Sequence, residues 1–175
     1  MKKVWLLLPF TFVFALIVVF FFALRDETDS SILESALLNQ PLPERPLKLL
    51  DGDEMINLAE VAQDGPFLLN IWGTWCPACR TEHPVLNELA AQGIRIVGVN
   101  YKDEPLAAKK WLIELHNPYF LNVEDPIGNY GLDLGVYGAP ETYFIDGQGI
   151  IRHRVVGEVT RTMWREELQS IWESL

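Results

Sequence analysis

The chain contains two cysteines, Cys76 and Cys79, separated by two residues. They follow a strongly apolar run, Phe67 to Trp72, and precede a helical pattern that starts at Pro77. At the start of a helix this spacing brings both sulfur atoms within bonding distance, and the unpaired N–H groups there favour a thiolate. The pair is therefore predicted to cycle between dithiol and disulfide, with Cys76 as the more accessible attacking thiolate and Cys79 as the resolving thiol.

Three other uses of the two cysteines remain open. A purely structural disulfide would close so small a loop that it removes little entropy from the unfolded chain. A zinc site needs about four ligands, and the histidines His83, His116 and His153 are scattered. Copper suits thiol ligands, yet no methionine or histidine cluster accompanies them. We expect no metal site and no bound cofactor.

The cysteine motif and its neighbours resemble the thioredoxin superfamily over residues 47–175. A strand leads into Trp75-Cys76-Pro77-Ala78-Cys79, and the following helix contains Pro84. The resemblance implies an α/β thioredoxin-like fold, in which helices flank a central mixed sheet. It also implies that Pro140, in the segment 138–142, is a cis-proline facing the sulfur atoms. Trp75 and Pro140 would then form a docking edge for an extended substrate.

Three further segments are similar to the CcmG/DsbE family of cytochrome c maturation oxidoreductases, within the membrane-anchored TlpA/ResA-like group. They span residues 80–83, 98–103 and 135–142. The region between Val99 and Pro140 is long enough for the added helix and strand of that group. The resemblance implies a reductant of apocytochrome c, or of its mixed disulfide with a CcmH-like maturation protein, before haem attachment. A membrane electron donor of the DsbD or CcdA kind would restore the dithiol.

One departure from thioredoxins concerns proton transfer. The buried acid that thioredoxins carry six residues before the first cysteine is replaced here by Asn70. Glu82, six residues after that cysteine, and Glu141, beside the proposed cis-proline, are the candidates to exchange protons with Cys79. For both glutamates a solvated position or a structural hydrogen bond remains the alternative.

The same carboxylates indicate a redox direction. Negative charge near Cys76 destabilises its thiolate and favours the disulfide, which makes the protein a better electron donor. A general outward-facing disulfide reductase or isomerase is the alternative enzyme. A redox-inert docking or copper-delivery module is the alternative outside enzymes.

The rest of the domain alternates short apolar runs with helical patterns, which is typical of βαβ units. Strands are expected at Leu47–Leu50, Met55–Asn57, Phe67–Trp72, Ile94–Val99, Tyr119–Val123, Thr142–Ile145 and Ile150–Val156. Helices are expected at Pro77–Ala91, Pro105–Leu115, Ile127–Leu134 and Arg161–Trp172.

The N-terminal residues 1–25 are predicted to form an uncleaved signal anchor. Val4 to Leu24 contains no charged residue, and about 20 helical residues span a bilayer. Lys2 and Lys3 favour the cytoplasmic side, whereas acidic residues follow the run. The C-terminal domain should therefore lie in the periplasm, held at the inner membrane; a cleaved secretory signal is the alternative.

Residues 26–46 are expected to be a linker, because three prolines fall within six residues and favour a semi-rigid spacer. The thioredoxin-like domain would begin at residue 47. The formal net charge of −10 argues against nucleic-acid binding, which requires clustered lysine and arginine side chains.

Overall fold

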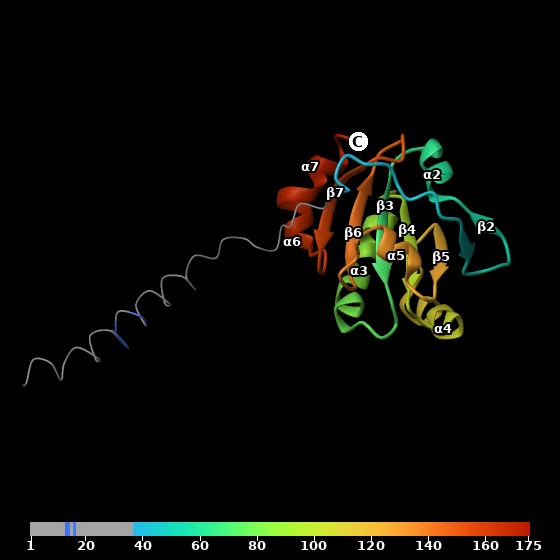
Figure 1. Cartoon of the computed structure of the whole chain (residues 1–175), viewed down its shortest axis with the longest axis horizontal. Helices are drawn as coiled ribbons and strands as arrows, with labels where there is room; N and C mark the ends of the chain where they lie inside the picture. The colour runs from blue at the N-terminus through green and yellow to red at the C-terminus, as the bar shows by residue number, and fades with distance from the viewer. Residues whose placement is uncertain (1–12, 15, 17–36) are drawn as a thin grey trace, which may run out of the picture. The chain divides into compact units, whose positions relative to one another are not determined.

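The computed structural model describes residues 13, 14, 16 and 37–175 (Figure 1). The expected anchor at residues 1–25 therefore lies almost wholly outside the described residues, as does most of the expected linker. Within the part that is described, no helix is both long enough and apolar enough to span a bilayer.

A mixed sheet organises the domain. Over the described residues it has seven strands in the order β2-β1-β5-β4-β3-β6-β7. β3, β4 and β5 are parallel neighbours, whereas β1, β2, β6 and β7 pair antiparallel. The strands are β1 (Leu47–Leu49), β2 (Met55–Ile56), β3 (Phe67–Trp72), β4 (Ile96–Tyr101), β5 (Leu121–Asp125), β6 (Glu141–Ile145) and β7 (Ile151–Val156).

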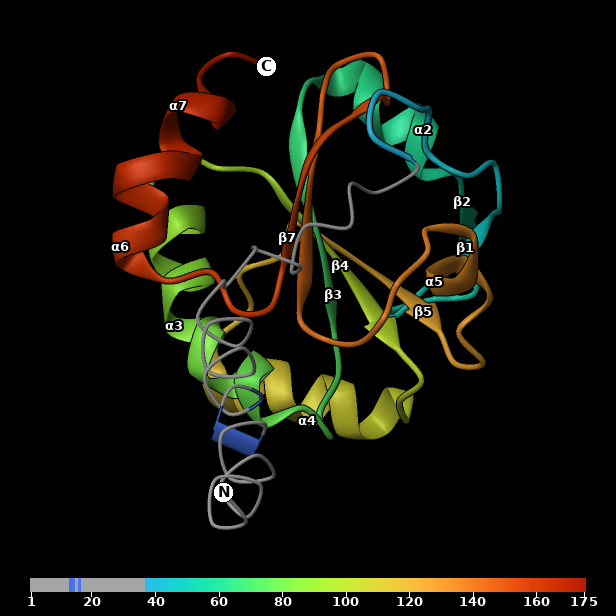
Figure 2. The ribbon, with the colours of Figure 1, turned by 60° about the vertical axis from the view of Figure 1, so that its left-hand side comes forward.

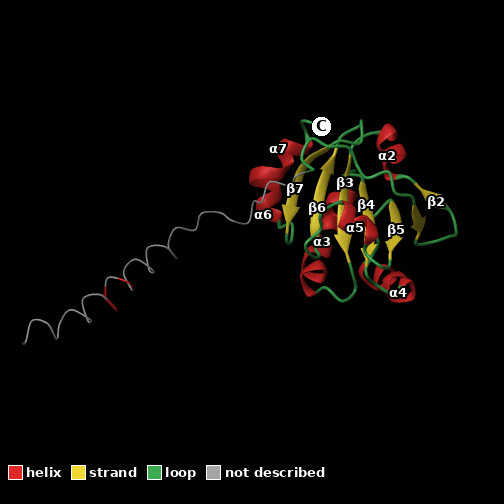
Figure 3. Ribbon diagram, in the orientation of Figure 1, coloured by secondary structure: helices red, strands yellow, loops and turns green. Residues whose placement is uncertain are grey.

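Helices cover both faces of this sheet (Figures 2 and 3). One face carries α3 (Pro77–Ala91), α4 (Pro105–Leu115) and a C-terminal helix made of α6 (Arg161–Met163), the π-helical η2 (Trp164–Leu168) and α7 (Gln169–Trp172). The other face carries α2 (Leu58–Val61), η1 (Ala62–Asp64) and α5 (Asn129–Asp133). This is the expected thioredoxin-like arrangement, and α4 with β5 forms the expected insertion.

The central strand β3 is buried along its whole length. Successive side chains of a strand point to opposite faces. Leu68 and Trp72 accordingly pack in the core under α3 and α4, whereas Leu69 and Ile71 pack under α2 and α5. Asn70 has the same parity as Leu68, so its amide points toward α3, the helix that carries the cysteines.

Most element boundaries agree with the sequence pattern, and β3, α3 and α4 agree at both ends. β4 begins at Ile96 instead of Ile94, because the amide of Ile94 still donates to Leu89 O and closes the end of α3. β5 begins at Leu121 instead of Tyr119, whose amide donates to the Asn117 side chain in a turn.

The short helix α2 was not predicted. Asn57, which was expected to end a strand, instead caps this helix, and its side chain accepts the Ala59 amide at 3.0 Å. Asparagine is a strong helix N-cap because its side chain satisfies an otherwise unpaired amide.

The last residues of the expected linker lie on the domain. The amide of Asn39 donates to Ile151 O at 2.8 Å, and that of Leu42 donates to Gly149 O at 2.9 Å. The Leu42 side chain is buried in the core under α2 and α5. These residues therefore do not act as a free spacer, and the packed domain begins before residue 47.

Candidate active site

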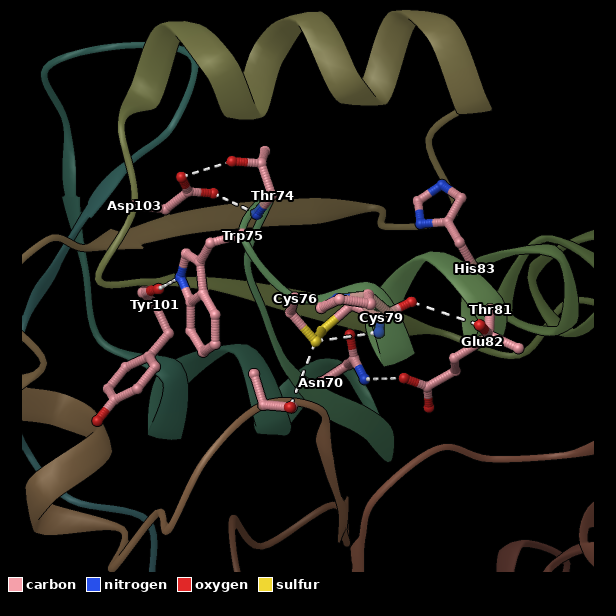
Figure 4. The surroundings of a disulfide bond; sticks show 12 residues. Asn70, Thr74, Trp75, Cys76, Cys79, Thr81, Glu82, His83, Tyr101 and Asp103 are labelled. Carbon is pink, nitrogen blue, oxygen red and sulfur yellow. Dashed lines mark hydrogen bonds between the residues drawn. A yellow bond between two sulfur atoms is a disulfide. The ribbon is translucent and has the colours of Figure 1, made fainter.

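Cys76 and Cys79 form a disulfide just beyond the C-terminal end of β3, with their Cα atoms 5.3 Å apart (Figure 4). Cys76 is the N-cap of α3, and Pro77 occupies the first helical turn, where a missing N–H costs no hydrogen bond. Cys76 Sγ accepts the amide of Cys79 at 3.0 Å. The same N–H, at the positive end of the helix dipole, would stabilise a Cys76 thiolate in the reduced protein.

The expected difference in accessibility between the two cysteines is absent in this disulfide form. Cys76 is 2% exposed and Cys79 is 3% exposed. The loop before β6 accounts for the burial of Cys76, because Ala139 O lies 3.3 Å from its Sγ. The Ala139–Pro140 peptide bond is cis, as the resemblance implied.

Trp75 projects beside the disulfide and is half exposed, at 50%. Its indole Nε1 donates to Tyr101 O at 3.0 Å, which ties the ring to the end of β4. A Cβ on residue 73 would lie 2.5 Å from that nitrogen. The indole can therefore occupy this position only because residue 73 is a glycine. Trp75 therefore presents a fixed aromatic surface next to the sulfur atoms (Figure 4).

Asp103 anchors the loop that leads into the cysteine motif. It accepts the amide of Thr74 at 2.6 Å and the Thr74 hydroxyl at 2.7 Å. Asn100 and the Glu104 amide also donate to it, both at 2.9 Å. Burial opposes ionisation, but these hydrogen bonds prevail and lower the pKa of Asp103.

Glu82 is buried on the same helix as the disulfide, at 1% exposure. It lies one turn after Cys79 on the same face of α3, because residues three apart are neighbours on a helix. Its carboxylate accepts the amide of Val159 at 3.1 Å, the amide group of Asn70 at 3.4 Å and the Thr142 hydroxyl at 3.5 Å. Burial raises the pKa of Glu82 to about 7, although these hydrogen bonds lower it.

Asn70 is fully buried and connects Glu82 to its surroundings (Figure 4). Its Nδ2 also donates to Thr142 Oγ1 at 3.0 Å, and its Oδ1 accepts the Tyr119 hydroxyl at 2.9 Å. The position that holds an acid in thioredoxins thus holds a neutral amide here, and the ionisable carboxyl comes from α3.

Glu141 is also fully buried, but its carboxylate is directed elsewhere. It forms an ion pair with Arg154, Nη2 to Oε2, at 2.7 Å, and accepts the Tyr143 hydroxyl at 2.7 Å. The amides of Tyr137 and Gly138 donate to its other oxygen at 2.8 and 3.3 Å. Glu141 therefore shapes the loop before Pro140, and its predicted proton exchange with Cys79 stays a prediction.

His83, one of the three histidines considered above as zinc ligands, links α3 to α4. Its Nε2 lies 2.7 Å from His116 O, while Trp111 Nε1 donates to its Nδ1 at 3.4 Å. Burial lowers the pKa of His83. A neutral ring with its proton on Nε2 satisfies both contacts, so this residue serves packing of the cysteine helix.

Several site residues escaped sequence reasoning because no local pattern connects them to the cysteines. Tyr119 comes from the insertion, Thr142 from β6, and Val159 from the turn after β7. Asp103 carried a usable signal, since it lies two residues after the end of a buried strand that is parallel to β3.

Comparisons with known proteins agree with this geometry. The family described as Redoxin matches residues 38–171. The thiol:disulfide interchange protein DsbE of Pseudomonas aeruginosa is 52% identical over 176 residues, covering 100% of this chain and 96% of that protein. The DsbE of Escherichia coli K12 is 48% identical over 177 residues, covering 99% and 96%. A solved DsbF homologue from Corynebacterium diphtheriae is 26% identical with a TM-score of 0.63, covering 78% and 87%.

Proposed function

Because the chain belongs to the DsbE family of thiol:disulfide interchange proteins, within the Redoxin family, we propose that it is the reductant that prepares apocytochrome c for haem attachment. The observation that carries the chemistry is the Cys76–Cys79 disulfide at the start of α3, with the Cys79 amide on Cys76 Sγ. The chain is a thiol-disulfide oxidoreductase. The identity of its client is what we propose.

The first step is attack by the reduced protein on the client disulfide. The Cys76 thiolate bonds to one client sulfur, the client S–S bond breaks, and the departing sulfur takes a proton. The Cys79 amide and the helix dipole stabilise the attacking thiolate. A mixed disulfide between Cys76 and the client results.

The second step releases the client. Cys79 loses its proton and bonds to Cys76 Sγ, while the second client sulfur departs as a thiol. The client gains two electrons and two protons, and the enzyme is left with the disulfide seen in this structure. Glu82 is the proposed proton acceptor, because its buried carboxyl lies one turn from Cys79 and burial brings its pKa to about 7.

An ionised Glu82 also favours donation of electrons. Its negative charge beside the dithiol disfavours a thiolate at either cysteine, which shifts the equilibrium toward the disulfide. A reduction potential as high as that of a dedicated disulfide-forming enzyme would contradict this direction.

The docking edge is proposed to consist of Trp75 and Pro140. Trp75 supplies a half-exposed ring, and Ala139 O, directly before Pro140, lies 3.3 Å from Cys76 Sγ. An extended client segment could pair with the backbone there while its sulfur meets Cys76.

We propose that the N-terminal anchor holds this domain on the periplasmic side of the inner membrane. Residues 4–24 support the proposal because they form an uncharged run of spanning length. A membrane donor of the DsbD or CcdA kind would return two electrons to Cys76–Cys79. A CcmH-like protein would present the client as a mixed disulfide.

The deciding experiment uses Cys79→Ser in the full chain, expressed in cells that assemble c-type cytochromes. The variant can attack through Cys76 but cannot resolve, so it should accumulate a mixed disulfide that mass spectrometry identifies. Cys76→Ser is the matched control and should trap nothing. Recovery of apocytochrome c or its maturation partner supports the proposal.

A broad set of unrelated trapped proteins would instead establish a general reductase. Retention of cytochrome assembly by the Cys76→Ser variant would show a redox-inert docking role and would contradict both enzymatic functions.

A further inference from the structure

Tyr119 lies in the α4–β5 insertion, far along the chain from the cysteine helix, yet its side chain is almost fully buried at 5% exposure. Its ring stacks on Trp72 with centroids 5.5 Å apart and planes 19° apart. Its amide donates to Asn117 Oδ1 at 3.0 Å, which fixes the backbone before β5. Ring and backbone are therefore held independently of the hydroxyl.

The Tyr119 hydroxyl begins a directed series of hydrogen bonds. It donates to Asn70 Oδ1 at 2.9 Å, and Asn70 Nδ2 in turn donates to Glu82 Oε2 at 3.4 Å. An asparagine amide has a donor end and an acceptor end. Since a donor already faces its oxygen, the amide must present its NH₂ group to Glu82.

We propose that Tyr119 is a positioning residue for thiol–disulfide exchange, because its hydroxyl orients the Asn70 amide so that an N–H donor faces the Glu82 carboxylate. This inference rests on the proposed role of Glu82 as proton acceptor. The insertion thereby contributes to the proton chemistry of the cysteine helix, to which it is not adjacent in sequence.

The Tyr119 hydroxyl is expected to lower the pKa of Glu82 by way of Asn70. An N–H donor stabilises the ionised form of Glu82, which counteracts burial. Burial raises the pKa of Tyr119 well above its ordinary value, so the hydroxyl remains a donor throughout the working pH range. Without that hydroxyl, only the hydrogen bond from Asn70 Nδ2 to Thr142 Oγ1, at 3.0 Å, still opposes rotation of the amide. A rotated amide would turn its oxygen toward Glu82, which favours the protonated carboxyl.

Among the described residues, two elements besides α3 bring an ionisable group to Glu82. The turn after β7 contributes Glu158, whose charge raises the Glu82 pKa, and the insertion contributes Tyr119. The two strands facing the carboxyl supply the neutral side chains Asn70 and Thr142. On its own helix, Cys79 lies one turn earlier.

The test is an infrared titration of the Glu82 carboxyl in the full-length oxidised protein, with the spectrum of Glu82→Gln subtracted to isolate the band. Tyr119→Phe keeps the ring and its stacking and should raise the midpoint by about one pH unit. Tyr130→Phe is the matched control, because that buried hydroxyl has no hydrogen-bond partner among the described residues. Its midpoint should equal that of the unmodified protein.

A double variant separates orientation from packing. Asn70→Ala should itself raise the midpoint, and adding Tyr119→Phe should raise it no further, because Tyr119 acts through Asn70. Equal midpoints for Tyr119→Phe and the unmodified protein, or additive shifts in the double variant, would overturn the inference.

The pH profile of client reduction distinguishes this failure from failure of the proposed proton acceptor. If Glu82→Gln leaves the profile unchanged, the proton role of Glu82 is wrong, whatever the infrared midpoints show. Suppose instead that Glu82→Gln abolishes the change in client-reduction rate near neutral pH, but Tyr119→Phe leaves the pH of that change unaltered. Only the positioning role of Tyr119 then fails.

Discussion

The Val159 amide donates a hydrogen bond to Glu82 Oε1 at 3.1 Å, although the two residues are 77 positions apart in the chain. This contact joins the cysteine helix to the turn that precedes the C-terminal helix. With Asn70 on β3 and Thr142 on β6, it surrounds one buried carboxyl with hydrogen bonds from three other parts of the fold. An ionisable group held in this way makes the stability of the domain depend on pH.

Glu82→Gln should make stability less dependent on pH. The folded-state pKa of Glu82 is raised by burial from 4.5 to about 7, so the native state binds the proton more tightly than the unfolded chain. Its contribution is therefore most favourable below about pH 4.5 and is lost as pH rises toward about 7. The shift corresponds to about 3 kcal/mol.

Urea unfolding of the two proteins from pH 4 to 8 measures this difference. The stability of the unmodified protein relative to Glu82→Gln should fall across the interval. Glu60→Gln changes an exposed glutamate on α2 and serves as the control, with a constant difference expected. Parallel curves for Glu82→Gln and the unmodified protein would show that the carboxyl does not titrate in this range.

Asp103→Asn should loosen the loop before the disulfide. The substitution replaces an ionised acceptor of four hydrogen bonds with an amide that can accept at one atom only, and we expect a loss of about 1–3 kcal/mol. The hydrogen bonds lower the pKa of Asp103 although burial opposes them, so its stabilisation is present above the unfolded value of 3.8. That stabilisation disappears as pH falls through the lower folded value.

Thermal unfolding at pH 7 and at pH 3 tests this sign. The difference in melting temperature between Asp103→Asn and the unmodified protein should be larger at pH 7 than at pH 3. Asp53→Asn is the control, since that side chain is fully exposed and pairs with Lys48 across the turn between β1 and β2. A larger penalty at pH 3 would contradict the assignment.

Local pattern was sufficient to predict the elements that carry the cysteines. β3 and α3 have the predicted bounds because an apolar run broken only by Asn70 and a Pro at the helix start are strong local signals. The Asn70 candidate followed from the resemblance to thioredoxins, and the Glu82 candidate from its spacing to Cys76. Their mutual hydrogen bond, and the full burial of Glu82, depend on how α3 lies across the sheet.

The partners of Glu141 show what local pattern cannot provide. Its place beside Pro140 suggested proton chemistry, but the side chain pairs with Arg154, which the β6–β7 register brings opposite the same region. Such contacts are set by strand pairing, and one sequence contains no signal for them. Tyr119 escaped notice for the same reason, because its hydroxyl reaches β3 from an insertion.

Glu141→Gln should destabilise the domain strongly. It leaves the Arg154 guanidinium, whose side chain is 5% exposed, without its carboxylate partner. Removing one member of a buried ion pair costs about 3–5 kcal/mol. The double variant Glu141→Gln/Arg154→Met should be more stable than Glu141→Gln alone, since no unpaired charge remains.

A double-mutant cycle compares the unmodified protein, Glu141→Gln, Arg154→Met and the double variant. Chemical unfolding of these four proteins gives the coupling energy between Glu141 and Arg154. Arg152→Met provides a comparison on the same strand, because Arg152 pairs with Asp146 at a partly exposed site and should cost less. Equal losses of unfolding free energy for Arg152→Met and Arg154→Met would show that the buried ion pair contributes no more to stability than the partly exposed one.

Gly73→Ala should impair reaction with a protein client more than reaction with a small disulfide. The added Cβ would lie 2.5 Å from Trp75 Nε1 and 3.0 Å from two ring carbons, so the indole must leave its hydrogen bond with Tyr101 O. The three atoms nearest to the added Cβ all belong to the Trp75 ring, so the substitution acts first on the indole, and a small disulfide needs no docking edge. The ratio of the two rate constants should fall by about tenfold, the equivalent of one lost hydrogen bond.

Stopped-flow measurement of both reactions with the reduced full-length protein provides that ratio. Gly147→Ala is the matched control, because its Cβ would meet nothing closer than 3.9 Å and it lies in the β6–β7 turn. It should leave the ratio unchanged. If Gly73→Ala slows both reactions equally, the glycine serves the geometry of the disulfide itself, and Trp75 has no separate part in docking the client.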